Sequence, residues 1–202
     1  MSLRKTVPLA VAFATLALLV GFGALSRFDQ WGVDHLMPGA SFGEKEPTIT
    51  DSLVPLLGAH WDTWLGGVAN IVTLPASFLI SLAIVAWRSR LLAVALIAAV
   101  AVEIVCKELI DRPALYDGAF HITSFDSSFP SGHTLRTIIV AAAIWPLLRG
   151  WAAAWALASI VLLQLAGWHT PTDVIGGVLL GLLALLGARG AGALRARRLA
   201  RG

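Results

Sequence analysis

Six apolar segments, each long enough to cross a lipid bilayer, constrain the fold of this chain more than any other feature. A membrane-spanning helix needs about 17–25 predominantly apolar residues. Runs of this kind occupy residues 7–25, 66–87, 91–110, 131–148, 151–168 and 172–188. Charged residues make up only 13% of the chain, against ~25% in soluble domains. The sequence therefore predicts an all-α polytopic membrane protein with six transmembrane helices.

The first apolar segment follows a basic N-terminus, as does the hydrophobic core of a secretory signal peptide. Its apolar stretch is longer than the about 7–15 residues of a signal core, and further apolar segments follow. We therefore expect a retained first helix and one membrane domain over residues 1–202, with a basic cytoplasmic tail at 189–202. The single cysteine, Cys106, excludes an intramolecular disulfide and a cysteine-based metal site.

The positions of the basic residues predict the orientation in the membrane. If the N-terminus is cytoplasmic, ten of the fifteen lysines and arginines fall on the cytoplasmic side, as the positive-inside rule requires. They are Arg4, Lys5, Arg88, Arg90, Arg149, Arg189, Arg195, Arg197, Arg198 and Arg201. We therefore expect both termini in the cytoplasm and the basic tail to contact anionic lipids rather than nucleic acid. Arginine outnumbers lysine 12 to 3, which favours a bacterial inner (plasma) membrane protein.

The predicted orientation gathers ionisable residues from distant parts of the sequence at the outer membrane face. These residues are Lys107, Arg112, His133, Arg136, His169 and Asp173. Ionisable groups at membrane depth are energetically costly and indicate a functional site. We therefore expect a polar site that faces the periplasm or the exterior.

Several of these polar residues also have purely structural explanations. Ser131 is suited to capping the fourth helix, and Thr170 and Asp173 fit a capping box at the start of the sixth. Such explanations do not cover His133 and His169, which lie at the same predicted depth. The two histidines are therefore the strongest indication of chemistry.

The start of the fourth helix has the features of a phosphate site. Its free N–H groups and the positive end of its dipole attract an anion, and Gly132 allows the anion to approach the backbone closely. The predicted phosphate-binding residues are Lys107, Arg112, Ser131, Gly132 and Arg136. Carboxylates are too few and too scattered for a two-metal site, so neither a metal nor another cofactor is expected.

Three residues are suited to phosphoryl transfer. Asp173 follows His169 by four residues and can hold one imidazole nitrogen, which leaves the other as a nucleophile. His133 can then protonate the leaving oxygen. We predict that these residues are catalytic and that the reaction passes through a phosphohistidine.

Three motifs resemble the type 2 phosphatidic acid phosphatase superfamily. They are "KELIDRP" (107–113), "PSGH" (130–133) and "HTPTD" (169–173), in that order. The resemblance covers about residues 66–190. It implies an integral-membrane, metal-independent phosphohydrolase acting on a lipid phosphomonoester, such as phosphatidate or phosphatidylglycerol phosphate, or on a polyprenyl pyrophosphate.

The resemblance also implies a role for each matching residue. His169 would be the nucleophile, Asp173 its activator and His133 the general acid. The residues that match the family's phosphate-binding positions are Lys107, Ser131 and Gly132.

The sequence departs from the family pattern at two arginines. The family has six residues between its lysine and an Arg-Pro pair, whereas four residues separate Lys107 from Arg112. A second family arginine lies six residues before the nucleophile, where this chain has Leu163. We hypothesise that Arg112 and Arg136 replace these arginines. The alternative for Arg136 is a structural bond to Glu103 or to a backbone carbonyl.

The displaced arginines leave a second function open, namely a catalytically weakened relative that binds or translocates lipid phosphates. A proton-coupled transporter is disfavoured, because the polar residues gather at one face rather than along the membrane depth. The long outer stretch 26–65 is expected to contain a short interfacial helix near 51–61, as a lid or as packing over the site.

Overall fold

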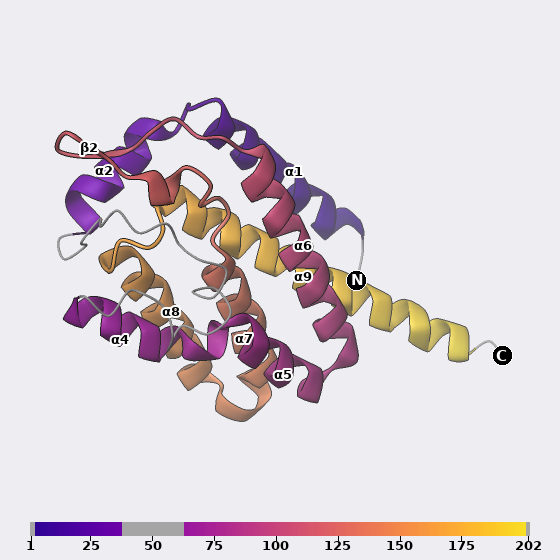
Figure 1. The fold of residues 1–202 in the computed structure, drawn as a ribbon. Coiled ribbons are helices and arrows are strands. Elements are labelled where there is room, and N and C mark those ends of the chain that lie inside the picture. Colours follow the sequence, from indigo (N-terminus) through magenta and orange to yellow (C-terminus); the bar gives the residue numbers. More distant parts are fainter. Residues whose placement is uncertain (1–2, 38–62, 201–202) are drawn as a thin grey trace.

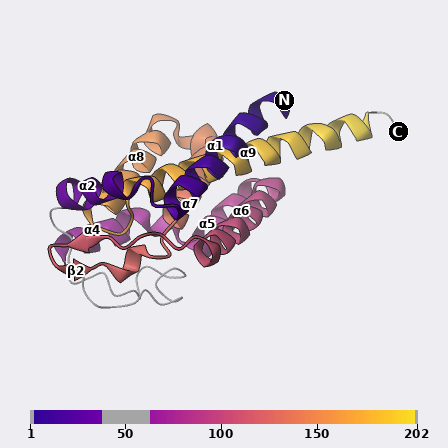
Figure 2. The same ribbon diagram turned by 90° about the horizontal axis from the view of Figure 1, so that it is seen from above.

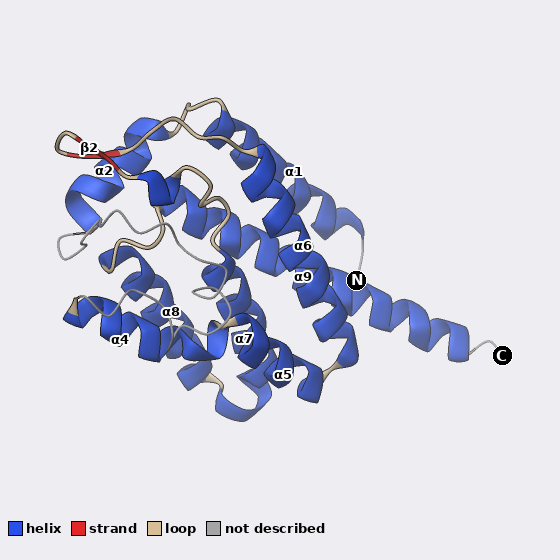
Figure 3. Cartoon of the chain, in the orientation of Figure 1, coloured by secondary structure: helices blue, strands red, loops and turns tan. Residues whose placement is uncertain are grey.

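The structure, a computed structural model, describes residues 3–37 and 63–200, and this part of the chain is almost entirely helical (Figures 1 and 3). The α-helices are α1 (Leu3–Gly21), α2 (Ser26–Leu36), α4 (Trp64–Thr73), α5 (Phe78–Arg88), α6 (Arg90–Leu109), α7 (Gly132–Leu148), α8 (Gly150–Leu165) and α9 (Pro171–Leu199). The shorter elements are the 3-10 helices η2 (Leu74–Ala76) and η3 (Thr123–Phe125) and the antiparallel strands β1 (Tyr116–Asp117) and β2 (Phe120–His121).

Each predicted apolar segment coincides with a helix or a pair of helices. The second segment is divided into α4, η2 and α5 because Pro75 cannot donate a helical hydrogen bond. Side-chain caps begin other helices: Ser89 accepts from the N–H of Leu92 at the start of α6. The prediction of an all-α fold is therefore confirmed.

Within the described part of the chain, two helical stretches are long and apolar enough to cross a membrane by themselves, Trp64–Arg88 and Pro171–Ala193. A third candidate is the pair formed by α1 and α2, which are bent by 84° relative to each other. The α7 and α8 helices are apolar but shorter. The structure thus supports a membrane protein, whereas six spans and two cytoplasmic termini remain predictions.

The core of the bundle forms around α7, which packs against α5, α6, α8 and α9. The buried cluster includes Leu135 and Ile139 from α7, Leu96 from α6 and Leu180 from α9. Large apolar side chains on the outward faces of the bundle remain exposed, among them Val94, Ile97, Leu157 and Val161. An exposed apolar surface of this kind is suited to contact with lipid.

The two ends of the described chain lie on the same side of the bundle. Figures 1 and 2 show α9 extending past the other helices toward the C-terminus, with the N-terminal end of α1 on that side. The loop that carries β1 and β2 lies at the opposite end. This arrangement agrees with the predicted separation of the termini from the polar site.

Helix α2 was not predicted, because its buried face is not apolar. That face consists of Asp29, Gly32 and Val33, so the spacing of apolar residues does not reveal it. The helix packs against the loop between α6 and α7 in a second buried cluster: Val33, Met37, Leu115, Ile122 and Phe125. The interfacial helix expected near 51–61 lies outside the described residues.

Candidate active site

The two histidines singled out in the sequence lie side by side. His133 is in the first turn of α7, and His169 lies in the short connection between α8 and α9. Their ring centroids are 5.9 Å apart, and the ring planes are inclined by 54°. The ring of Trp168 lies 5.6 Å from that of His133 on the same side of the bundle. The structure thus brings together two imidazoles that the membrane topology was expected to place at one face.

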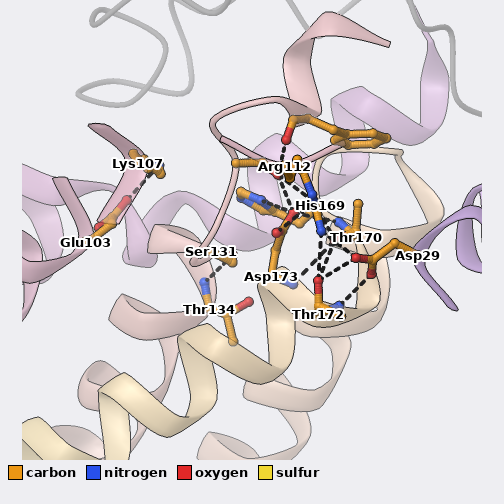
Figure 4. Close-up of polar contacts among 12 residues, drawn as sticks. Asp29, Glu103, Lys107, Arg112, Ser131, Thr134, His169, Thr170, Thr172 and Asp173 are labelled. Atoms are coloured by element: carbon orange, nitrogen blue, oxygen red, sulfur yellow. Dashed lines mark hydrogen bonds and ion pairs between the residues drawn. The ribbon is translucent and has the colours of Figure 1, made fainter. Parts of the chain in front are cut away.

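Asp173 serves both as a helix cap and as a neighbour of His169. Its Oδ2 accepts a hydrogen bond from the N–H of Thr170 at 2.9 Å, while its own N–H donates to Thr170 Oγ1 at 3.4 Å. This is the reciprocal capping box expected at the start of α9. The same Oδ2 lies 3.7 Å from Nδ1 of His169 (Figure 4). The structural and the functional explanations of Asp173 are therefore compatible.

His169 is buried, and burial is the main reason that its pKa is lowered below the usual value for histidine. The Asp173 carboxylate opposes this lowering of the pKa, because a negative charge stabilises the imidazolium. The separation of 3.7 Å between Nδ1 and Oδ2 is longer than a hydrogen bond. A neutral imidazole with its Nδ1 facing a carboxylate is the state that a nucleophilic Nε2 requires.

Ser131 is the N-cap of α7. Its Oγ accepts a hydrogen bond from the N–H of Thr134 at 3.2 Å, and its own N–H donates to the carbonyl oxygen of Asp173 at 2.9 Å. The side chain is completely buried. The hydroxyl proton is not used in the capping bond, so the same side chain retains a donor that can face a phosphate.

A carboxylate occupies the position beside Gly132 where the sequence predicted a phosphate. A Cβ added at Gly132 would overlap the Glu103 side chain, so only glycine permits this close approach. Lys107 Nζ donates to Glu103 Oε1 at 2.9 Å, one helical turn along α6. Figure 4 shows this pair on α6, to one side of the hydrogen-bond cluster around Asp173. Glu103 is therefore a buried carboxylate paired with a cation.

Arg136 is held by structural contacts. Its Nε donates to the carbonyl oxygen of Ala76 at 2.6 Å, and its NH1 lies 3.4 Å from Glu103 Oε2. These are the structural contacts, with Glu103 and with a backbone carbonyl, that were the alternative to phosphate binding for Arg136. The contribution of Arg136 to phosphate binding remains a prediction.

Arg112 lies at the centre of a buried network between two carboxylates (Figure 4). Its NH1 donates to Asp173 Oδ1 at 3.1 Å, and its NH2 donates to Oδ2 of Asp29. Three hydroxyl groups also accept from the guanidinium: Ser128, Thr170 and Thr172. The guanidinium is therefore directed toward carboxylates, and its predicted contact with a phosphate is a proposal.

Asp29, Ser128 and Thr172 also belong to this network, although the sequence did not mark them as part of the site. Ser128 donates to Asp173 Oδ2 at 2.7 Å, and Thr172 donates its hydroxyl to Asp29 Oδ2 at 2.7 Å. Thr172 lies within the motif 169–173, so its proximity could have been inferred. Asp29 lies far from every motif, and no local pattern marks it.

Among residues 3–37 and 63–200, no three histidine, cysteine, aspartate or glutamate side chains are arranged so that they could hold a metal ion. The side chains gathered at the site are two imidazoles, carboxylates and cations. This set can attack, protonate and bind a phosphoryl group.

Comparison with solved structures identifies a protein with a similar fold. The fold is similar to the crystal structure of a transmembrane PAP2-type phosphatidylglycerolphosphate phosphatase from Bacillus subtilis, with a TM-score of 0.58 and 20% sequence identity. The similarity covers 95% of this chain and 97% of that one. The comparison with curated protein sequences gave no match.

A family model provides the sequence evidence. It matches residues 89–192, which is more than half of the chain and runs from the start of α6 into α9. Of the residues that form the site, only Asp29 in α2 and Ala76 in η2 lie outside this match. The chain belongs to the PAP2 superfamily.

Proposed function

We propose that this membrane protein is a lipid phosphate phosphatase that acts through a phosphohistidine at His169, on the outer face of the membrane. The observation that carries the proposal is the grouping of His169, His133 and Asp173. The two imidazole rings are 5.9 Å apart, and the carboxylate lies 3.7 Å from Nδ1 of His169. Membership of the PAP2 superfamily supports the same conclusion.

The reaction would proceed in two balanced steps. Nε2 of His169 attacks phosphorus, the bond from phosphorus to the lipid oxygen breaks, and His133 donates a proton to that oxygen. Water then attacks the phosphohistidine, His133 accepts a proton from the water, and inorganic phosphate leaves. Asp173 stabilises the positive charge that forms on His169 in the first step.

The charge of the phosphate would be neutralised at the start of α7 and by nearby cations. Free N–H groups of the first turn and the hydroxyl of Ser131 would donate to the phosphate, and Lys107 would give up its contact with Glu103 to bind it. Arg112 and Arg136 stay in the proposal as the replacements for the displaced family arginines. Most of the catalysis would come from positioning and from stabilisation of charge in the transition state.

The test is phosphate release by the purified protein in detergent, with EDTA present. The lipids are phosphatidylglycerol phosphate, chosen first because of the structurally similar Bacillus subtilis protein, then phosphatidate and undecaprenyl pyrophosphate. We expect release that persists in EDTA and falls at least about a thousandfold in His169→Ala. The matched control is His121→Ala in the outer loop, an exposed histidine that should retain wild-type activity. Release that survives in His169→Ala would overturn the mechanism.

A second function is favoured by the carboxylate contacts of Arg112 and Arg136. If both guanidinium groups stay bound to Asp173 and Glu103, the protein would bind or translocate lipid phosphates and hydrolyse them weakly. Folded protein that shifts vesicle-bound phosphatidylglycerol phosphate between leaflets, without releasing phosphate, would support this alternative.

A further inference from the structure

Asp29 is a buried acid in a helix outside the family match, and it contacts the proposed active site directly. Only 1% of Asp29 is exposed. Its Oδ1 accepts from the N–H of Thr172 at 3.0 Å, and its Oδ2 accepts from the hydroxyl of Thr172 at 2.7 Å. Oδ2 also accepts from Arg112 NH2. A residue of α2 thus caps the first turn of α9.

The position of α2 against α9 depends on Gly32. A Cβ added there would lie 2.5 Å from Cγ of Pro171, the first residue of α9. Gly32 follows Asp29 by one turn, so the close approach and the carboxylate lie on the same face of α2. The docking of this helix therefore places Asp29 beside Thr172.

Arg112 connects Asp29 to the residue that faces the nucleophile. The guanidinium donates from NH2 to Asp29 and from NH1 to Asp173 Oδ1 at 3.1 Å. The opposite oxygen of Asp173 lies 3.7 Å from Nδ1 of His169. Figure 4 shows Asp29 and Asp173 on either side of the hydrogen bonds around Arg112. The contacts form a continuous path from α2 to the imidazole.

A planar guanidinium holds two carboxylates in a defined relative geometry, which a single ammonium group cannot do. The side chains of Arg112, Asp29 and Asp173 are 3%, 1% and 0% exposed, so each charge needs the others. With both carboxylates ionised, the three residues carry one net negative charge. That charge favours the imidazolium that develops when His169 attacks phosphorus.

We propose that Asp29 is a positioning residue for the nucleophile: through Arg112 it holds Asp173 against His169, and α2 is therefore part of the active site. The proposal rests on the proposed function of His169. It adds a role in aligning Asp173 to the phosphate contact that is proposed for Arg112. Loss of Asp29 would consequently change the chemical step more than the binding of substrate.

Other charged groups around His169 must be considered in any pH measurement. They are Asp173 from α9, Glu103 and Lys107 from α6, His133 from α7, and Arg112, which acts through Asp173. Asp29→Asn and Arg112→Lys leave the side chains of Glu103, Lys107 and His133 unchanged. A displaced pH profile in these variants therefore reports on this path.

The experiment compares Asp29→Asn with Asp34→Asn, a matched change at an exposed aspartate of the same helix. We expect Asp29→Asn to lower kcat about tenfold or more while KM stays within about threefold. The acidic limb of the kcat/KM profile should move to lower pH, because loss of a negative charge destabilises the imidazolium of His169. Asp34→Asn should match the wild type in all three quantities.

A second variant covers the case in which Asp29→Asn folds poorly. Arg112→Lys keeps the positive charge but cannot bridge both carboxylates, so a positioning role predicts a fall in kcat with little change in KM. A raised KM with unchanged kcat would instead show that Arg112 acts only in binding the substrate and does not position Asp173. Wild-type kcat and an unmoved acidic limb in Asp29→Asn would overturn the proposal. If the proposed phosphatase function were itself wrong, the result would be different: the wild type would show no activity, or His169→Ala would retain it.

Discussion

The Glu103 carboxylate lies against Gly132, at the first residue of α7, where the sequence predicted a bound phosphate. Lys107 donates to Glu103 at 2.9 Å from the solvent side, and Arg136 approaches at 3.4 Å from the interior. An anion of the protein thus occupies the region that a helix start and two cations make favourable for anions. A substrate phosphate would compete with Glu103 for Lys107.

This contact makes Gly132→Ala a sensitive test of the site. The added methyl group would overlap the Glu103 carboxylate, and overpacking of this kind costs about 1–3 kcal/mol. We expect a lower Tm and a loss of kcat/KM of about tenfold or more, because Lys107 and the start of α7 would shift. The measurements are thermal unfolding in detergent and phosphate release.

The control for the glycine change is Gly187→Ala in α9. No atom lies within 4 Å of a Cβ added at Gly187, so the methyl group meets open space. Alanine favours a helix over glycine by up to ~1 kcal/mol, and Gly187→Ala should keep wild-type activity. Equal Tm and activity in Gly132→Ala and in the wild type would contradict the close contact with Glu103.

Ser131→Ala separates capping from phosphate binding. Loss of the cap on Thr134 should reduce the free energy of unfolding by about 1 kcal/mol. If the hydroxyl also donates to the phosphate, kcat/KM should fall about tenfold as well. The control is Ser89→Ala, which removes the equivalent cap of α6 at the other end of the helix bundle. Ser89→Ala should lower stability alone, and equal activity of the two variants would limit Ser131 to a structural role.

The sequence predicted the helices and the proximity of His133, His169 and Asp173 because both depend on strong local signals. Apolar runs mark the helices, and the motifs around His133 and His169 contain caps whose chemistry is local. The capping box of Thr170 and Asp173 forms as expected. Successive apolar segments are expected to cross the membrane in alternating directions. That expectation was sufficient to bring the two histidines to the same end of the bundle.

The sequence could not predict contacts that depend on tertiary packing. Asp29 reaches Thr172 across 143 positions of the chain, and its helix has a polar buried face. The directions of the Arg112 and Arg136 side chains depend on the same kind of contact, since carboxylates from other elements accept their hydrogen bonds. Charge and spacing alone identify a cation near a site but not its partner.

Arg136→Ala distinguishes a phosphate ligand from a structural arginine. Because Arg136 donates to the carbonyl of Ala76 and lies beside Glu103, its loss leaves a buried carboxylate with one fewer partner. We expect the free energy of unfolding to fall by about 3 kcal/mol. If the arginine also binds phosphate, kcat/KM of the folded fraction should fall by more than about threefold, or ~0.7 kcal/mol.

The double variant Glu103→Gln with Arg136→Met provides the control, since it removes both members of the buried pair and should recover part of the lost stability. Activity of Arg136→Ala within threefold of the wild type would rule out the replacement of the missing family arginine.

The pKa of His169, lowered chiefly by burial, predicts how stability and activity depend on pH. Its imidazole charges more readily in the unfolded chain, near pH ~6.5, than in the folded protein. Folding therefore releases protons between the unfolded and the folded pKa values, and stability is lost as the pH falls through this window. Above it, His169 is neutral and able to attack phosphorus.

We therefore expect Tm to fall as the pH is lowered from 7, and to fall less in His169→Gln, which has no group to titrate. The kcat/KM profile of the wild type should keep its acidic limb below the pKa of an ordinary histidine, because the nucleophile remains neutral there. His121→Gln, a change at an exposed histidine, should leave both curves unchanged. An acidic limb above pH ~6.5 would mean that Asp173 outweighs burial, and that His169 is protonated in much of the resting enzyme at neutral pH.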